Sequence, residues 1–248
     1  MDPPEKIPAN LLNEYTLTGK IPVYSWYINE MVEPRTIIWS DDYLNSFIER
    51  FSFDRIKSNT HGTEQYLNAS LIHVECCEKY IDSIRGKDVA VIGSQFPWIE
   101  AILVNAGAKS VTTVEYNVPV CNHTVISTIS YDDFCKSNVT FDSIFSYSSI
   151  EHSGLGRYGD PLNPNGDIET MEHIYRVLKP NGYCFLGVPV GKDALVWNAH
   201  RIYGTLRLPL VYLNKFEEVE WLGFDKSLLY SSNSDQDFTK QPIIVLKK

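Results

Sequence analysis

The sequence predicts an α/β fold: a doubly wound, Rossmann-like sheet preceded by a mainly helical N-terminal extension. From residue 88 onward, short β-branched segments alternate with helical ones, the pattern of a parallel sheet covered on both faces. Residues 141–189 read strand, polar loop, amphipathic helix and strand, and such a unit is normally a right-handed crossover between parallel strands. Two strand-like segments close the chain and predict a hairpin at one edge of the sheet.

Residues 1–85 are predicted to form the extension, and residues 86–248 the α/β domain. Four prolines within the first 22 residues interrupt the beginning of the chain. Asp41–Arg50 reads as a helix capped by Ser40 or by an aspartate. Leu67–Ile84 carries apolar residues at helical spacing, and Arg85-Gly86 ends it.

The α/β domain opens with a short strand of the buried type, Asp88–Ile92, which Gly93 closes. A proline suits the first turn of the next helix, Trp98–Ala106, and a glycine follows at its C-cap. The second strand, Val111–Glu115, ends in an acidic residue. The remaining predicted elements are strands Thr124–Ser130 and Phe141–Ser149, helix Ile168–Leu178, strand Tyr183–Val188, and the edge hairpin of Lys215–Leu222 with Pro242–Lys247.

Composition argues against several functional classes. The 248 residues carry a net charge of −9 and show no Lys/Arg cluster, so we expect no nucleic-acid partner. No apolar run approaches the roughly 20 residues that span a bilayer, and no signal peptide is recognisable, which predicts no membrane association and a cytoplasmic location. Asn68, Asn122 and Asn138 stand in glycosylation sequons, which leaves a secretory location open if the chain is a truncated form.

A polar, glycine-rich loop, Glu151–Gly166, follows the fourth strand. Ligands of open parallel sheets bind outside the carboxyl ends of the strands, and this loop leaves one such end. It holds far more chemistry than a connector needs, with Glu151, His152, Arg157, Tyr158 and Asp160 in one short span. We therefore expect this loop to border the functional site.

Two residues end neighbouring strands in the way that a nucleotide-binding crossover requires. Gly93 allows a ligand to approach the backbone, and Glu115, 22 residues later, can accept hydrogen bonds from both ribose hydroxyls. The loop after the first strand contains one glycine where the nucleotide-binding fingerprint has three. The alternative interpretation is therefore a tight strand-to-helix turn that binds nothing.

The segment from Asp88 to Lys247 resembles the class I S-adenosylmethionine-dependent methyltransferases. The resemblance rests on Arg176–Gly182 (RVLKPNG) before a hydrophobic strand, on Phe141-Asp142 at the start of the fourth strand, and on Glu151-His152 after it. It implies a methyltransferase-like sheet with S-adenosylmethionine as cofactor.

The same resemblance implies roles for individual residues. Gly93 and Ser94 would lie against the methionine part of the cofactor, and Glu115 would hold the ribose. Asp132 or Asp133 would face the adenine, and Ser148 and Ser149 would line the cofactor from the fourth strand. We expect the first strand to lie between the second and the fourth, with Gly93, Glu115, Asp132 and Ser148 around one cleft.

Two further segments look like the signatures of an uncharacterised family, catalogued as a domain of unknown function and known from nematodes and bacteria. They are Ser148–Pro161 (SSIEHSGLGRYGDP) and Trp197–Tyr203 (WNAHRIY). Neither segment brings an established reaction with it.

Three residues are predicted to be catalytic. The imidazole of His152 can remove a proton from a methyl acceptor, with Glu151 beside it, or the pair can simply hold the loop by hydrogen bonds. His200 can face the substrate from above the sheet. Arg157 can bind a carboxylate or phosphate, or form a salt bridge inside the loop. Tyr158, Asp160 and Arg201 complete the predicted substrate-binding set.

We expect no metal site. Asp160 and Asp167 could ligate a metal with Glu151 or His152, but their spacing fits no known metal-binding loop. Asp167 is interpreted instead as the N-cap of the Ile168 helix. The five cysteines show no CxxC or His pairing and are interpreted as reduced or buried.

Three functions fit these residues. The first is an S-adenosylmethionine-dependent methyltransferase acting on a small-molecule or glycan-type acceptor. The second is a non-catalytic binding or scaffold protein on the same fold, and the third is a nicotinamide-dependent enzyme. The glycine-poor loop counts against the third more than the first, because a pyrophosphate needs close backbone approach and S-adenosylmethionine has no phosphate. The polar loop favours an enzyme.

Overall fold

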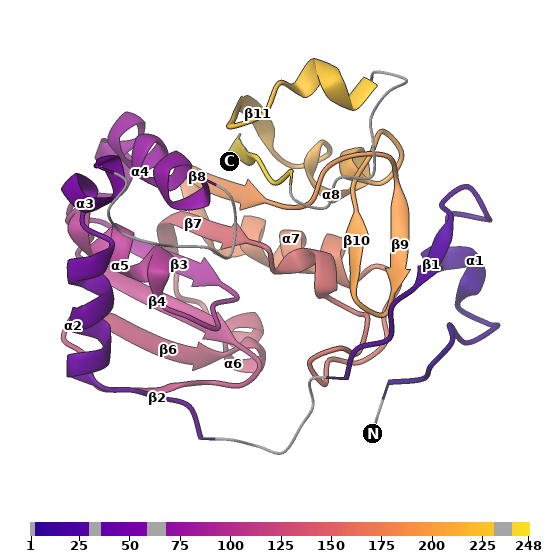
Figure 1. Cartoon of the computed structure of the whole chain (residues 1–248), viewed down its shortest axis with the longest axis horizontal. Coiled ribbons are helices and arrows are strands. Elements are labelled where there is room, and N and C mark those ends of the chain that lie inside the picture. Colours follow the sequence, from indigo (N-terminus) through magenta and orange to yellow (C-terminus); the bar gives the residue numbers. More distant parts are fainter. Residues whose placement is uncertain (1–2, 30–35, 59–67, 231–239) are drawn as a thin grey trace.

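The computed structural model describes residues 3–29, 36–58, 68–230 and 240–248. Its centre is a sheet whose seven strands in the described part run in the order β11-β12-β8-β7-β3-β4-β6 (Figure 1). The strands are β3 (Asp88–Ile92), β4 (Ser110–Glu115), β6 (Ile126–Ser130), β7 (Phe141–Tyr147), β8 (Leu178–Gly187), β11 (Glu217–Leu222) and β12 (Ile243–Lys247).

Strands β6, β4, β3, β7 and β8 are parallel, whereas β12 pairs antiparallel with β8 and β11 antiparallel with β12. The predicted doubly wound α/β fold is therefore confirmed, with its hairpin at the edge. The first strand of the α/β domain lies between the second and the fourth, as expected, because β3 pairs with both β4 and β7.

Alternating side chains of each strand face two different layers of helices. Val89 and Val91 pack with α2 (Asp41–Arg50), α4 (Ala69–Lys79) and α5 (Trp98–Asn105). Ala90 and Ile92 face the other layer, which consists of α6 (Tyr131–Lys136), α7 (Gly166–Val177) and α8 (Leu208–Tyr212). Both faces of the sheet are thus buried, which explains the nearly continuous apolar runs of its central strands.

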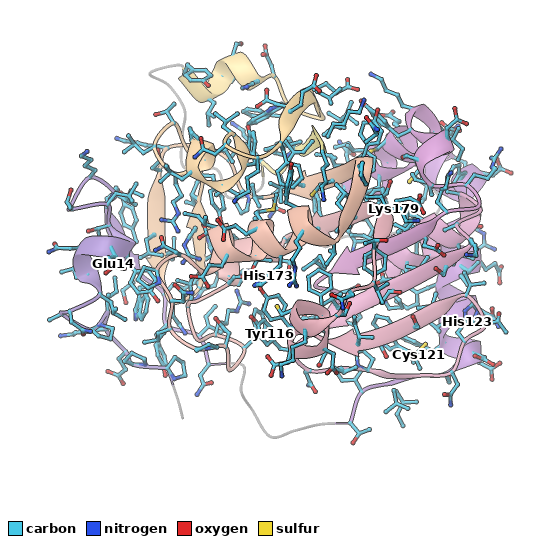
Figure 2. All side chains as sticks on the ribbon, turned by 180° about the vertical axis from the view of Figure 1, so that it is seen from behind. Glu14, Tyr116, Cys121, His123, His173 and Lys179 are labelled. Carbon is cyan, nitrogen blue, oxygen red and sulfur yellow. The ribbon has the colours of Figure 1, made fainter. Side chains whose placement is uncertain are left out.

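The described residues before residue 86 contribute to two separate places. Helices α2 and α4 belong to the main core, together with the short α3 (Phe53–Lys57) and the 3₁₀ turn Ile81–Ser83. Strand β2 (Ile38–Trp39) pairs with β5 (Val120–Cys121). Helix α1 (Leu12–Tyr15) and strand β1 (Val23–Ser25) instead reach the opposite end of the molecule, where Glu14 of α1 lies far from Cys121 of β5 (Figure 2).

At that end, β1 pairs parallel with β9 (Ala194–Trp197), which pairs antiparallel with β10 (His200–Ile202). The N-terminal segment is therefore joined by backbone hydrogen bonds to a segment about 170 residues away, a pairing that no local pattern could indicate. The division of the chain at residue 85 stays a prediction.

Several element boundaries differ from the predicted ones. The predicted helix Leu67–Ile84 is α4, which ends at Lys79 before the 3₁₀ turn, and Leu67 lies outside the described residues. Helix α7 begins at Gly166, two residues earlier than predicted, so that Asp167 lies inside the helix rather than at its cap. Helix α2 has the predicted bounds, and the side chain of Ser40 accepts a hydrogen bond from the backbone N–H of Tyr43.

Candidate functional site

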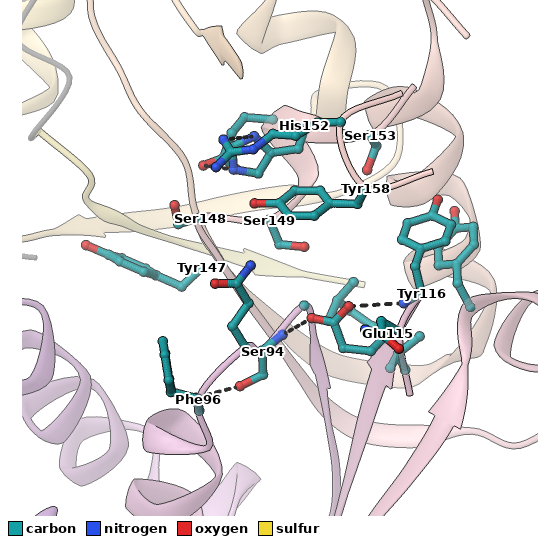
Figure 3. A pocket seen from close by; sticks show the side chains of 18 of the residues that line it. Ser94, Phe96, Glu115, Tyr116, Tyr147, Ser148, Ser149, His152, Ser153 and Tyr158 are labelled. Carbon is teal, nitrogen blue, oxygen red and sulfur yellow. Dashed lines mark hydrogen bonds and ion pairs between the residues drawn. The ribbon is translucent and has the colours of Figure 1, made fainter. Parts of the chain in front are cut away.

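A pocket of about 960 Å³ lies at the carboxyl ends of β3, β4 and β7, below the loop that follows β7 (Figure 3). Its volume is in the range of cofactor and substrate sites. Of the predicted site residues, Gly93, Ser94, Glu115, Ser148, Glu151, His152, Arg157, Tyr158, Asp160 and His200 line it. Asp132, Asp133 and Arg201 are not among its lining residues.

The ends of β3 and β7 approach each other closely at Gly93. Its φ is +78°, and a Cβ at this position would lie 2.1 Å from Oγ of Ser149. Only glycine fits this conformation and this contact. Ser148 also has a positive φ, of +54°, which is uncommon for a residue with a side chain and typical of functional sites.

Glu115 links the ends of β3 and β4 through backbone hydrogen bonds. Its Oε1 accepts from the N–H of Ser94 at 2.6 Å, and its Oε2 accepts from the N–H of Tyr116 at 3.0 Å (Figure 3). Burial raises the pKa of this carboxyl. A carboxylate has about four acceptor positions, so Glu115 retains capacity for a ligand hydroxyl.

Glu100 of α5 supports the same loop from below and was not predicted from the sequence. It is fully buried, its Oε1 accepts from Oγ1 of Thr113 at 2.7 Å, and its Oε2 lies 3.0 Å from Oγ of Ser94. Burial raises its pKa to about 7. The available signal was an isolated glutamate in the apolar segment Trp98–Val104.

Two tyrosines form the wall beside Glu115. The rings of Tyr116 and Tyr131 lie 4.9 Å apart with a 30° tilt, and both line the pocket. The two aspartates that follow Tyr131 do not line the pocket, whereas we expected Asp132 at the cleft and one of the two facing the adenine. The carboxylate of Asp133 accepts a hydrogen bond from the hydroxyl of Ser130, the residue that caps the start of α6. The side chain of Asp132 is 83% exposed.

Glu151 brings a buried carboxyl group to the other side of the pocket. The residue is 1% exposed, and its Oε2 has no hydrogen-bond partner among the described residues. Burial raises its pKa to about 7, although hydrogen bonding from Ser148 and the charge of Arg157 act in the opposite direction. A carboxyl with this pKa changes protonation near neutral pH, as a general base must.

His152 is held by a carbonyl from the second signature segment. Its Nδ1 lies 2.6 Å from the carbonyl oxygen of Ala199, and its Nε2 lies 3.7 Å from Oε1 of Glu151. Burial, followed by the charge of Arg157, lowers the pKa of His152 to about 3. The imidazole is therefore neutral at working pH.

Arg157 and Tyr158 lie beside His152. The guanidinium carbon of Arg157 is 4.9 Å from the centroid of the Tyr158 ring, and its Nη1 donates to the carbonyl of Ala199 at 3.2 Å. Tyr158 extends between His152 on one side and the Ser94–Glu115 pair on the other (Figure 3). It thus separates two ends of one pocket.

Two predicted substrate-binding residues hold the loop itself. One carboxylate oxygen of Asp160 accepts from the N–H groups of Gly154 and Gly156, at 2.7 and 3.1 Å. Arg201 is 4% exposed and donates to the carbonyls of Glu151, Ser153 and Pro164 at 3.3, 2.6 and 3.3 Å. Arg201 therefore joins the two signature segments from behind the pocket.

Asp167 is also part of this support, which corrects its interpretation as an N-cap. Its carboxylate is fully buried and receives two hydrogen bonds from Arg207, at 2.5 and 3.1 Å, and one from Tyr203 at 3.0 Å. The charges of Arg201 and Arg207 outweigh burial and lower its pKa. Sequence reasoning missed Arg207, because nothing near it in the chain indicates a buried partner.

His200 and Trp26 close the pocket from the side of the β9–β10 ribbon. Their ring centroids are 6.1 Å apart in an edge arrangement, and Trp26 is 58% exposed. Burial, followed by the charge of Arg157, lowers the pKa of His200 to about 4. Trp26 comes from the segment after β1, so the N-terminal extension contributes to the pocket wall.

Within the described ranges, no group of three or more His, Cys, Asp and Glu side chains is arranged to hold a metal ion. No helix in the same part of the chain combines the length and apolarity needed to cross a membrane.

The Ser148–Pro161 and Trp197–Tyr203 segments both lie in a part of the chain that matches a family model. Residues 86–246 match the model of the family described as Caenorhabditis protein of unknown function, DUF268. The chain belongs to this family. No curated protein sequence matches the DUF268 chain.

Solved structures show which fold the DUF268 chain shares. One is the N-methyltransferase NodS from Bradyrhizobium japonicum WM9, in complex with S-adenosyl-L-homocysteine. The match covers 84% of this chain and 99% of NodS, at 12% identity and a TM-score of 0.51. TehB from Haemophilus influenzae is 15% identical; the match covers 77% of this chain and 65% of TehB, with a TM-score of 0.48. A SAM-dependent methyltransferase candidate from Streptococcus mutans is 12% identical over 70% of this chain and 48% of its own, with a TM-score of 0.45.

The DUF268 chain spans about half the length of two of the methyltransferase structures that it matches, 48% and 50%. At these identities the likeness shows the fold alone. The fold is that of the class I S-adenosylmethionine-dependent methyltransferases.

Proposed function

We propose that this protein is an S-adenosylmethionine-dependent methyltransferase acting on a small-molecule or glycan-type acceptor. The observation that carries the proposal is one pocket with two carboxyl groups in different settings. Glu115 ends a strand where the fold family holds a ribose, and Glu151 is a buried carboxyl group with an unpartnered oxygen among the described residues.

The end of the pocket near Glu115 fits the cofactor in chemistry. A carboxylate can accept the vicinal ribose hydroxyls, and the rings of Tyr116 and Tyr131 offer an apolar surface for a purine. Arg157 is the sole Lys or Arg among the described lining residues, and it lies at the other end. The loop after β3 has a single glycine, which favours a cofactor without phosphate over a dinucleotide, whose pyrophosphate needs close approach to backbone N–H groups.

At the other end, Glu151 is the proposed proton acceptor. The pKa of Glu151, raised by burial to about 7, suits proton removal near neutral pH better than that of His152, lowered by burial to about 3. When bound, the cofactor supplies an electrophilic methyl group. The protein then aligns the acceptor, takes up its proton and excludes water, which is most of what this chemistry requires.

Calorimetry with S-adenosylmethionine and S-adenosylhomocysteine tests the cofactor site. We expect wild-type protein to bind both, and Glu115→Ala to weaken binding about tenfold or more, because hydrogen bonds to a charged acceptor contribute roughly 1.5–3 kcal/mol. Asp132→Ala is the matched control, since its carboxylate is exposed and away from the pocket. Absence of binding at millimolar cofactor would refute the proposal.

The alternative is a non-catalytic binding protein on the same fold. It is favoured by the fact that both oxygens of Glu115 already accept backbone N–H groups, which a purely structural residue would also do. Under this alternative, Glu115→Ala lowers the melting temperature without changing the affinity for either cofactor form.

A further inference from the structure

Two hydrogen-bond acceptors, one on His152 and one on Glu151, lie near each other in the wall of the pocket. The carbonyl oxygen of Ala199 can only accept, so the Nδ1 that lies 2.6 Å from it must carry the proton of His152. In this neutral ring Nε2 carries a lone pair and no proton, and it lies 3.7 Å from Oε1 of Glu151. That separation is too long for a hydrogen bond.

The charged groups around this pair keep the imidazole neutral. Arg157 contacts the same Ala199 carbonyl at 3.2 Å, and Arg201, whose Nε lies 3.7 Å from the Asp167 carboxylate, donates to the carbonyl of Glu151. Both cations oppose a third positive charge on His152. The ring therefore cannot supply the missing donor by taking up a second proton.

When Glu151 is ionised, its Oε2 has no hydrogen-bond partner among the described residues, and the hydrogen bonds of His152 run through Nδ1 rather than Nε2. A buried acceptor without a donor is costly, and a ligand that supplies donors removes this cost. An alcohol supplies one O–H, whereas a primary ammonium group supplies three N–H donors. A ligand that satisfies both Nε2 of His152 and Oε2 of Glu151 must supply at least two hydrogen-bond donors.

We propose, on the basis of the methyltransferase function above, that the group methylated is a primary amine, bound between Oε2 of Glu151 and Nε2 of His152. The amine binds in its ammonium form and gives one proton to the carboxylate of Glu151. The lone pair of the resulting neutral nitrogen then forms the new N–C bond with the methyl carbon. The electrons of the broken methyl–sulfur bond remain on sulfur, which becomes a thioether. The products are a methylated ammonium ion, protonated Glu151 and S-adenosylhomocysteine.

Small probes test this subsite without knowledge of the whole acceptor. Methylammonium chloride carries three N–H donors, methanol carries one O–H, and tetramethylammonium chloride carries the charge without any donor. Each is titrated into protein with ¹⁵N-labelled histidine, in the presence of S-adenosylhomocysteine, at about pH 8, where Glu151 is ionised. The readout is the Nε2 resonance of His152. Fragments of this size bind with dissociation constants on the order of tens of millimolar.

We expect a saturable shift with methylammonium and none with the other two probes. The shift should disappear in Glu151→Gln and persist in Glu14→Gln, a control at an exposed residue of α1 away from the pocket residue Tyr116 (Figure 2). An equal response to methanol or to tetramethylammonium overturns the amine proposal, as does the lack of a saturable response to methylammonium. The comparison of probes in wild-type protein decides the matter even if Glu151→Gln does not fold.

Binding of S-adenosylhomocysteine to the same sample separates the two proposals. If it binds and methylammonium shows no preference, the amine inference fails and the methyltransferase proposal stands. If S-adenosylhomocysteine does not bind, the proposed function itself fails.

Discussion

The carbonyl oxygen of Ala199 lies 2.6 Å from Nδ1 of His152, and this contact joins the two signature segments of the chain. It does so at the point where the pocket meets the β9–β10 ribbon, and Arg157 donates to the same carbonyl at 3.2 Å. One backbone oxygen thus fixes the orientation of an imidazole and the position of a guanidinium group.

The first prediction follows from this contact. His152 should carry its proton on Nδ1 and should remain neutral from about pH 5 to about pH 8, because burial and then the charge of Arg157 lower its pKa to about 3. Nitrogen-15 NMR of the imidazole measures both properties. A titration of His152 with a midpoint near the ordinary pKa of histidine, about 6.5, would contradict the buried geometry.

The second prediction concerns the ion pair behind the loop. Arg207→Met should lower the free energy of unfolding by about 3–5 kcal/mol, because it leaves the fully buried carboxylate of Asp167 with less compensation. Lys215→Met is the control, since Lys215 and Glu172 are 38% and 48% exposed and such pairs contribute less than about 1 kcal/mol. Urea denaturation measures the free energy of unfolding of both variants. Equal losses would show that the Arg207–Asp167 pair does not stabilise the loop more than an exposed ion pair does.

The third prediction concerns the end of β3. Gly93→Ala should be more destabilising than Gly86→Ala, although both residues have a positive φ. The left-handed conformation costs each variant roughly 1–2 kcal/mol. Only at Gly93 does the added Cβ meet a neighbour, Oγ of Ser149 at 2.1 Å, whereas no atom lies within 4 Å at Gly86. Overpacking then adds about 1–3 kcal/mol at Gly93. Comparable melting temperatures for the two variants would argue against the tight turn.

The fourth prediction concerns acid stability. His73 is 1% exposed among the rings of Trp98, Phe145 and Tyr147, and burial lowers its pKa from 6.5 to about 4. Between these two values the unfolded chain binds a proton that the folded protein does not bind. Stability should therefore fall as the pH decreases through this window, by about 2 kcal/mol between about pH 7 and about pH 5 from His73 alone.

His73→Phe removes this titration while keeping a ring in the space, so the free energy of unfolding should depend less steeply on pH. Urea denaturation at the two pH values measures the slope. An unchanged slope in His73→Phe would mean that other groups, such as His152, account for the acid sensitivity.

The sequence by itself determined the elements of the sheet and the end of it that carries the pocket. Strands such as Asp88–Ile92 and helix Asp41–Arg50 were predictable because burial patterns and caps are local properties of the chain. The position of Glu115 and of the Glu151–Gly166 loop followed from the rule that carboxyl ends of parallel strands share one edge.

Only the tertiary structure decided what each polar side chain of that region contacts. Arg201 and Asp160 bind backbone of the loop, Asp132 faces solvent, and Glu100 is buried under the loop after β3. A polar residue next to a strand end looks the same in sequence whether its partner is water, a carbonyl group or a ligand. The partner comes from segments that are remote in the chain, as Ala199 does for His152, and only the folded backbone brings them within hydrogen-bond distance.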